Sequence, residues 1–237
     1  MDTFGDIKAA LQSDLTIGDE SSFIDESTVE NAINRAYINK VSAIYPWPQT
    51  EDAKVTSSIA NKEYYDYPDK WRPMSIWKLV VDGDDYDDPM AFRDYEYEKD
   101  NNYPSGTKKI WSSKGLRYFI TQDGASPTTN GDDNIEIHGH KIPDKLTDDN
   151  DETLFTLNMP ELNEAILLEA KAILKAKGEE DQPGQFASVE AKAICARAWK
   201  LLSGEMSKYE RSLPQFNVPD YFASKGGRTD PNRIGNF

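Results

Sequence analysis

The chain contains 237 residues and carries 42 acidic against 27 basic side chains, a net charge of −15. This charge repels the phosphate backbone and argues against a general nucleic-acid-binding protein. Apolar residues make up 38% of the chain, in runs far shorter than the roughly 20 residues of a membrane span. We therefore expect a soluble globular protein that makes no membrane contact.

The first residues predict a short amphipathic helix, because Phe4, Ile7, Leu11 and Leu15 recur at helical spacing. The same residues lack the basic and apolar regions of a signal peptide. We therefore expect the protein to stay in the cytoplasm or in a particle assembled there. The single cysteine, Cys195, excludes an intramolecular disulfide and every multi-cysteine metal motif.

The strongest helical pattern lies between Ser27 and Ile44. The stretch STVE at its start predicts a capping box, in which Ser27 and Glu30 bind each other's backbone amides. An apolar stripe then follows for about four turns. Its members are Val29, Ile33, Ala36, Tyr37, Val41 and Ile44.

A proline-rich stretch ends this helix. Tyr45 precedes Pro46, and a residue before proline is disfavoured in the helical conformation, so the helix is expected to stop there. We expect Tyr45, Pro46, Trp47 and Pro48 to form a rigid structural elbow that turns the chain into the next segment. Trp47 is expected to pack at the seam.

Residues 54–147 predict a β-rich insertion of antiparallel strands. Asp82–Gly83 and Lys114–Gly115 are hairpin turn signals between stretches of β-branched and aromatic residues. The alternating stretch NIEIHGHKI predicts another strand, and Met90–Lys99 predicts a short helix.

Helices return in residues 148–207. Pro160 fits a first helical turn, where its missing N–H costs nothing, and Gly178 is a typical helix stop. The apolar face between them consists of Leu162, Ile166, Ala170 and Ile173. A further helix over Phe186–Met206 carries alanines that permit close packing, namely Ala191, Ala193, Ala196 and Ala198. The short connection favours an antiparallel helical hairpin.

These segments predict an α+β fold. Residues 1–53 and 148–207 would form a mainly helical bundle, with the antiparallel β-rich insertion of residues 54–147 between them. Residues 208–237 would follow as an extended C-terminal arm.

The predicted arm differs in charge from the rest of the chain. Its five basic and three acidic residues give it a net charge of +2, which leaves 22 basic and 39 acidic residues on the other 207. It also keeps aromatic residues, which disordered tails usually lack. An arm of this kind is expected to lie on another acidic surface, most simply a neighbouring copy. The residues expected to make these contacts are Arg211, Leu213, Phe216, Val218, Tyr221, Phe222, Arg228, Arg233, Ile234 and Phe237.

No catalytic or metal motif emerges from the sequence. His138 and His140 share one strand face and could supply half a metal site, but two exposed strand histidines are the favoured interpretation. The acidic stretches DGDDYDD and TDDNDET lack the glycine and glutamate positions of an EF-hand loop. Cys195 lies mid-helix among alanines, as a buried thiol does. We therefore expect no enzyme activity, no metal and no cofactor.

Two other classes of function stay open at this point. The five tryptophans, Trp47, Trp71, Trp77, Trp111 and Trp199, could stack on sugars, although tryptophans more often fill cores. Paired carboxylates could make a hydrolase, although 42 acidic residues provide such pairs by chance. The tryptophans are expected to be mostly buried.

The run from Ser27 to about Lys99 resembles the head–tail connector (adaptor) proteins of tailed bacteriophages. In these proteins a helix with an alanine/tyrosine run ends at Tyr-Pro-Trp, as at Tyr45–Trp47 here. A Tyr-Asp-x-Pro-x-x-x-Arg motif follows, matched by residues 65–72, and then a hairpin with Asp-Gly, matched by residues 82–83. The resemblance covers about a third of the chain. The acidic loop Asp84–Asp88 has no counterpart in the family pattern.

The resemblance implies a structural virion protein at the neck between head and tail. About a dozen copies would form a cyclic ring beneath the portal protein. The C-terminal arms would grip the portal, and a stopper, tail or nozzle protein would bind below. DNA would pass through an acidic channel without specific binding. The alternatives are another neck or tail component, such as a stopper, tail-tube gatekeeper or tail terminator, and less plausibly a carbohydrate-binding module.

Overall fold

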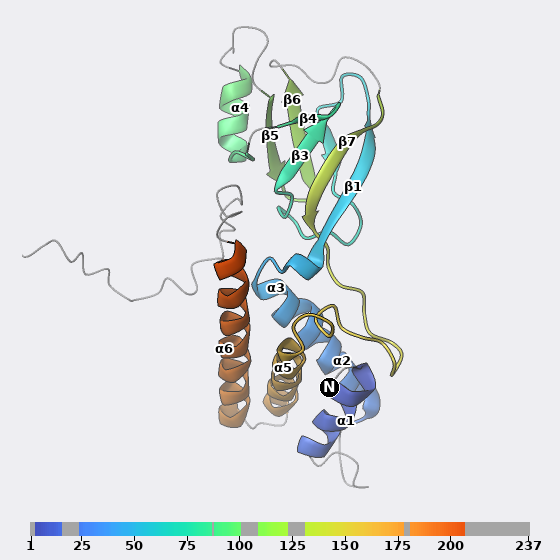
Figure 1. Ribbon diagram of the computed structural model, residues 1–237, viewed down its shortest axis with the longest axis vertical. Helices are drawn as coiled ribbons and strands as arrows, with labels where there is room; N and C mark the ends of the chain where they lie inside the picture. The colour runs from blue at the N-terminus through green and yellow to red at the C-terminus, as the bar shows by residue number, and fades with distance from the viewer. Residues whose placement is uncertain are drawn as a thin grey trace, which may run out of the picture.

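The computed structural model describes residues 3–15, 24–86, 88–100, 109–122, 131–177 and 181–206. Most helices occupy one end of the elongated molecule, and two antiparallel sheets with the short helix α4 occupy the other (Figure 1). The predicted α+β class is confirmed. The residues of the predicted arm, 208–237, lie outside the described residues.

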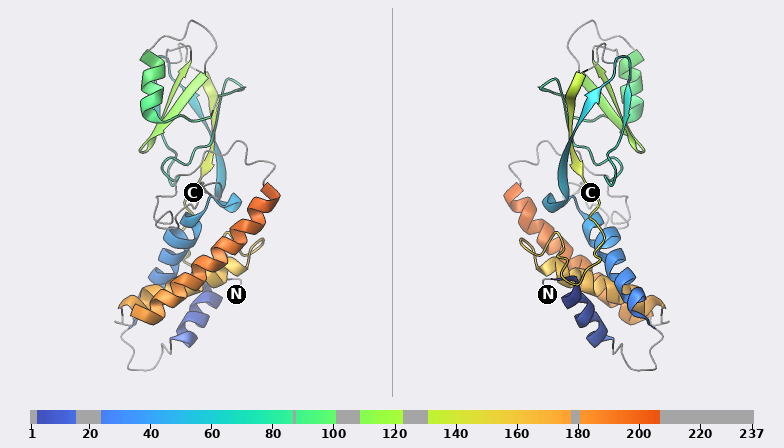
Figure 2. Two further views of the ribbon diagram at one scale, coloured as in Figure 1. Left: turned by 90° about the vertical axis from the view of Figure 1, so that its left-hand side faces the viewer. Right: turned by 90° about the vertical axis from the view of Figure 1, so that its right-hand side faces the viewer.

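The helical end is built from the first and last thirds of the chain. Its elements are α1 (Phe4–Asp14), α2 (Glu26–Ala36), the π-helical segment η1 (Tyr37–Val41), α3 (Ser42–Ile44), α5 (Glu161–Lys177) and α6 (Asp181–Met206). α5 lies between α2 and α6, and α1 packs against both α2 and α5 (Figures 1 and 2).

The predicted apolar stripe of the long helix is confirmed. Val29, Ile33, Ala36, Tyr37 and Val41 are all buried. They join the buried face of α5 in one core, in which the Tyr37 ring meets Phe155 edge to face at 6.2 Å between centroids. Burying side chains of this size contributes roughly 1.5–3 kcal/mol each, so the stripe accounts for the position of α2.

The predicted capping box at Ser27 is wrong, because the helix starts earlier. Asp25 is the N-cap, and its carboxylate accepts from the Thr28 amide at 2.8 Å. The Ser27 hydroxyl lies inside the first turn and donates to Asp25 at 3.2 Å. An aspartate caps as well as a serine, and its charge also favours the positive end of the helix dipole.

The start of α6 also differs from the prediction. The helix begins at Asp181, so the Pro183–Gly184 pair that resembles a loop lies within its first turn. Proline is tolerated there because the first amides of a helix have no partner within it. Gly184 allows α6 to approach α5 closely, because a Cβ at this position would lie 3.3 Å from the Ala172 carbonyl oxygen of α5. Of the four alanines, Ala191 and Ala198 are buried, whereas Ala193 is exposed.

The strands form two sheets. Their bounds are β1 (Glu51–Ser58), β2 (Tyr64–Asp66), β3 (Lys78–Val81), β4 (Asp84–Asp85), β5 (Lys109–Lys114), β6 (Arg117–Gln122) and β7 (Gly131–His140). One sheet has the order β1-β7-β3-β4 and the other β2-β6-β5. A second core rich in aromatic residues contains Trp71 and Trp111. The short helix α4 (Phe92–Asp100) packs against β5.

The predicted hairpins are both confirmed. β3 and β4 pair around Asp82–Gly83, and β5 and β6 pair around residues 115–116. Gly83 and Gly115 have φ values of +81° and +63°, which favour glycine. The predicted strand NIEIHGHKI is confirmed as part of β7, which pairs with both β1 and β3.

Gly139 of β7 is a point where the sheet tolerates no side chain. A Cβ there would lie 2.6 Å from a ring carbon of Trp71. We expect Gly139→Ala to lower the free energy of unfolding by about 1–3 kcal/mol in urea denaturation, because the buried indole must move. Combining it with Trp71→Phe, which removes the clashing ring edge, is expected to cost less than the sum of the two single changes. A Gly139→Ala variant as stable as the wild type would contradict this packing.

Candidate functional site at the junction of helices and sheet

The chain crosses between the helices and the sheet at two adjacent points. It enters β1 after Thr50 and leaves β7 at Lys141, whose amide donates to the Thr50 carbonyl at 2.8 Å. β1 and β7 are antiparallel partners with Glu51 opposite His140, so both crossings lie at the same end of the sheet (Figures 1 and 2). This junction is the part of the molecule where three distant segments of sequence meet.

The predicted helix stop before Pro46 is confirmed. α3 ends at Ile44, and Tyr45 has extended backbone angles of φ −137° and ψ 158°. Pro48 opens a 3₁₀ turn, η2 (Pro48–Thr50), that leads directly into β1. The four elbow residues therefore make up most of the connection between the last helical turn and the sheet, and Gln49 and Thr50 complete it.

Trp47 closes the end of the helical core. It is 0% exposed and meets Phe155 and Trp199 edge to face at 5.7 and 5.8 Å. Tyr45 stacks on Trp199 at 5.2 Å with nearly parallel rings. The elbow is thus fixed to α6 by aromatic contacts, which favour these edge-to-face and stacked arrangements.

The π-helical segment before the elbow has three carbonyls that accept from side chains. The Ser42 hydroxyl donates to Tyr37 at 2.6 Å, and the Trp47 indole N–H donates to Val41 at 2.7 Å. Arg72, from the β-rich end, donates to Ile38 at 3.3 Å. Wide turns of this kind are rare and often occur at functional sites. No sequence motif predicted the segment, because its donors are up to 34 residues away.

His140 corrects the prediction of two exposed histidines. It is 2% exposed, whereas His138, two residues earlier, is half-buried with Nε2 2.8 Å from the Glu136 carboxylate. Their strand face is open along most of its length, but the elbow covers it at the junction. The described residues contain no group of three or more His, Cys, Asp or Glu side chains that could hold a metal.

The imidazole of His140 is part of a buried hydrogen-bonded chain. Nδ1 lies 2.9 Å from the Thr50 hydroxyl, which donates its proton to the Trp47 carbonyl at 2.8 Å. In the tautomer that has its proton on Nδ1, the imidazole donates to the Thr50 oxygen, whose own proton is already used. Burial, and secondarily the charge of Arg72, lower the pKa of His140 to about 4. The ring is neutral at physiological pH and serves as a structural link between elbow and sheet.

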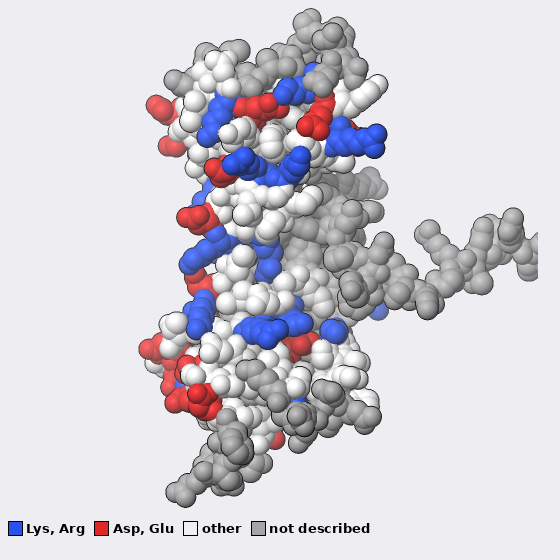
Figure 3. Space-filling model, turned by 180° about the vertical axis from the view of Figure 1, so that it is seen from behind, with Lys and Arg blue, Asp and Glu red and all other residues white. Residues whose placement is uncertain are grey.

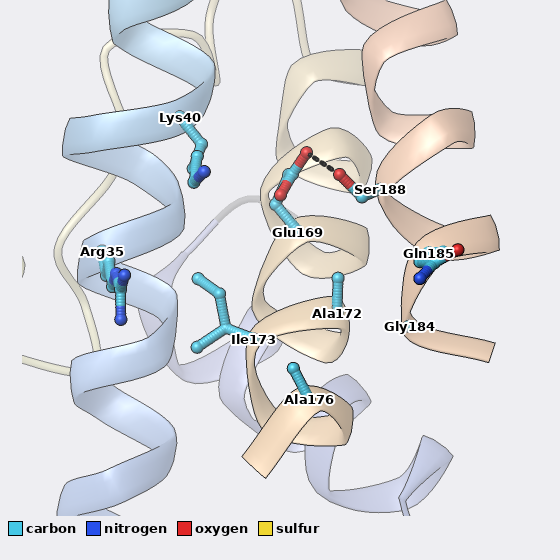
Figure 4. Close-up of a pocket in the computed structure, with 9 residues that line it drawn as sticks. All are labelled: Arg35, Lys40, Glu169, Ala172, Ile173, Ala176, Gly184, Gln185 and Ser188. Carbon is cyan, nitrogen blue, oxygen red and sulfur yellow. Dashed lines mark hydrogen bonds between the residues drawn. The ribbon is translucent and has the colours of Figure 1, made fainter. Parts of the chain in front are cut away.

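A groove opens within the helical end, on the side of α2 that faces the last turns of α5 and the first turns of α6 (Figure 4). Its volume is about 450 Å³. Arg35 and Lys40 stand on one rim, and Ala172, Ile173 and Ala176 lie along α5. Glu169, 5% exposed, accepts from the Ser188 hydroxyl at 2.8 Å. No sequence pattern predicted this groove, because its two sides are more than 120 residues apart in the chain.

The remaining predicted residues are the tryptophans, Cys195 and the residues of the arm. Trp47, Trp71 and Trp111 are buried and Trp77 and Trp199 are half-buried, so the prediction of mostly buried tryptophans is confirmed. Burial also raises the pKa of Cys195 to about 12, as expected for an unreactive thiol. All of the arm residues expected to make contacts, from Arg211 to Phe237, lie outside the described residues.

The described helices include none with the length and apolar character that crossing a lipid bilayer requires.

The indole hydrogen bond of Trp47 can be tested against a matched tryptophan. We expect Trp47→Phe to lower the free energy of unfolding by about 1–3 kcal/mol, because it leaves the Val41 carbonyl without its donor. Trp77 is the control, since its buried indole N–H has no acceptor among the described residues. Trp77→Phe should therefore cost clearly less in the same urea titration. Equal losses for the two variants would show that ring volume alone matters.

The buried imidazole predicts a pH dependence of stability. The pKa of His140 is about 4 in the folded chain against 6.5 for an unperturbed imidazole. As the pH falls from 7 towards 4, the imidazole of His140 becomes protonated in the unfolded chain but stays neutral in the folded chain. Stability should therefore fall by up to about 1.4 kcal/mol per pH unit from this group.

His140→Gln should flatten the stability profile between pH 6.5 and pH 5, whatever its effect on absolute stability. His138→Gln is the matched control and should keep the wild-type slope, because it leaves the imidazole of His140 in place. Chemical denaturation at each pH measures the slope. An unchanged slope in His140→Gln would contradict the buried, neutral state of this ring.

Comparison with known proteins agrees with the resemblance noted in the sequence. No curated protein gives a significant match. A sequence model described as SU10 adaptor protein, however, matches residues 2–215, which include both helical segments, the elbow and both sheets. The chain belongs to the SU10 adaptor protein family, a family of phage head–tail adaptors.

Proposed function

We propose that this protein forms a ring beneath the portal and links the capsid to the tail. About a dozen copies would make the ring, as cyclic symmetry allows one contact to be repeated until it closes. The portal would lie above it, and a stopper, tail or nozzle protein below. The match to a phage head–tail adaptor family over residues 2–215 is the observation that carries the proposal.

The described residues support a structural role without catalysis. The buried histidine is neutral and hydrogen-bonded, and the buried cysteine has a pKa of about 12. The most extensive polar networks of the junction end on backbone carbonyls, so they stabilise a bend and activate no nucleophile. We propose that the helical end acts as a bundle that holds the ring together.

The charge distribution supports passage of DNA without adhesion. The 207 residues before the arm carry 22 basic and 39 acidic side chains. Fixed negative charge releases no counterions from the phosphates, so a channel lined by such a surface would not retain duplex DNA.

The arm would hold the ring to its partners. α6 ends at Met206, close to the junction (Figure 1), and residues 207–237 follow it. We propose that the aromatic and basic side chains of the arm bind the portal or a neighbouring copy, as anchor residues do at interfaces. The chain would be assembled into the virion neck in the host cytoplasm.

Truncation after Ser207 tests the arm. The shortened chain keeps both cores, so we expect its thermal transition to stay within a few degrees of the full-length value. We also expect it to be absent from purified virions, or reduced at least tenfold, in a complementation assay. A full-length chain supplied in parallel is the control. Normal incorporation of the truncated chain would contradict the role of the arm.

Electron microscopy of the virion with a labelled chain would test the position itself. Density in a ring directly beneath the portal is expected. Density in the tail tube or at its end would instead favour the rival assignment to another tail component.

A further inference from the structure

The rim of the groove gains its charge from the π-helical segment. Arg35 and Lys40 are five residues apart, which in a regular α-helix would place them about 140° apart. The wide turn of Tyr37–Val41 contains one residue more than an α-turn, so Lys40 takes roughly the place of the fourth residue after Arg35. Both side chains consequently line the same groove (Figure 4). Both are exposed, and no ion pair is present on either within the described part of the chain.

Behind this basic rim, the interior of the groove is largely apolar, and its buried carboxylate already has a hydrogen-bond donor. Ala172, Ile173 and Ala176 present small apolar surface along α5. Among the described residues that line the groove, Glu169 carries the one carboxylate, which is buried and already accepts from Ser188. The two cations at the rim are therefore available to a ligand of opposite charge.

An acidic cluster stands on the other flank of α2. Lys8 of α1 is paired with Glu26, Glu30 and Asp149 at 3.0, 3.3 and 2.7 Å. One ammonium neutralises only one of three carboxylates, and Glu26 and Asp149 are 68% and 66% exposed. The cluster therefore keeps a negative excess that points to solvent.

Neighbouring carboxylates add to this excess. Asp25 precedes Glu26, and Asp148 and Asp151 flank Asp149 in the same loop. Hydrogen bonds from Thr28 lower the pKa of Asp25, and those from the amides of Asp148 and Thr147 lower the pKa of Asp151. Both carboxylates are ionised at neutral pH.

The two charged features lie on different sides of the molecule. Glu26 and Glu30 face α1, whereas Arg35 faces α5 and α6. Figure 3, which shows one face of the molecule, has acidic side chains gathered at one edge of the helical end. Because they lie on different sides of α2, the basic rim of the groove and the acidic cluster around Lys8 cannot pair with each other within one chain. They can do so between copies placed head to tail, which is the contact type that closes a ring.

We propose that the groove of one copy receives the acidic cluster of the next, so that Arg35 and Lys40 pair with carboxylates around Lys8 of the neighbour. The inference rests on the self-association that the proposed function requires, and it assigns the contact to a surface of the described residues. Because the contact is electrostatic and partly exposed, added salt weakens it.

Charge reversal in full-length chains tests the contact. Arg35→Glu with Lys40→Glu reverses the rim, and Glu26→Lys with Asp148→Lys reverses the cluster while leaving Lys8 two partners. Each double variant alone should self-associate at least about a hundred-fold more weakly than wild type in sedimentation velocity, because like charges then face each other. Circular dichroism and thermal melting establish that each variant is folded. A neutral pair, Glu26→Gln with Asp148→Asn, replaces the cluster variant if that one fails to fold and should weaken association to a smaller degree.

Mixing the two reversed variants gives the sharpest readout. In the mixture, the acidic groove rim of one variant can pair with the basic cluster of the other. The unchanged basic rim and acidic cluster can pair in the same way. The mixture should therefore regain wild-type association, with the two variants alternating. The matched control, Arg93→Glu with Lys114→Glu, makes the same charge change at the β-rich end and should associate as the wild type does.

Three results would overturn the inference. Unchanged association of both reversed variants would refute the contact while leaving the ring proposal intact. A wild-type chain that stays monomeric at the highest attainable concentration and low salt would refute the contact as an intrinsic property, whereas the proposed position in the virion would still be decided by microscopy. Binding of duplex DNA by the wild type but not by Arg35→Glu with Lys40→Glu would assign the groove to nucleic acid instead.

Discussion

The hydrogen bond from the Trp47 indole to the Val41 carbonyl meets a constraint on which the rest of the structure depends. A helix that ends inside a protein leaves carbonyl groups without partners, and each buried group left so costs about 1–3 kcal/mol. Here the helix widens into the π-helical segment and ends at Ile44, and the chain then turns at the elbow, all within about a dozen residues. Three of its carbonyls, those of Tyr37, Val41 and Ile38, accept side-chain hydrogen bonds from Ser42 of the helix, Trp47 of the elbow and Arg72 of the β-rich end. Three segments are thereby fixed relative to one another.

The same constraint links the fold to assembly. The turn that needs these donors also rotates Lys40 onto the side of Arg35, so the bend and the basic rim have one cause. Directly next to it, the neutral imidazole of His140 joins the sheet to the elbow through Thr50. Burial, and secondarily the charge of Arg72, lower the pKa of this imidazole and keep it uncharged. The junction thus combines neutral polar contacts with one guanidinium, that of Arg72, which donates to a backbone carbonyl.

Local chemistry made much of this fold predictable, and long-range contacts limited the rest. The helix stop at Pro46, the stripe from Val29 to Val41 and the two glycine hairpins depend on near neighbours, and all were predicted correctly. The Ser27 cap was wrong because two good capping residues lie two positions apart and only the helix dipole and packing choose between them. The burial of His140 and the groove beside Arg35 could not be predicted. Both depend on segments that meet only after folding.

The pairing of Thr50 with Lys141 has a consequence for how such a chain diversifies. Because the chain enters and leaves the sheet through hydrogen-bonded neighbours, the intervening ninety or so residues join the helices through a single narrow neck. A different module with adjacent ends could be exchanged at that neck, provided that it also replaces the donor that Arg72 supplies to the Ile38 carbonyl. The β-rich end can then vary in sequence and shape, while the helical end keeps its own core.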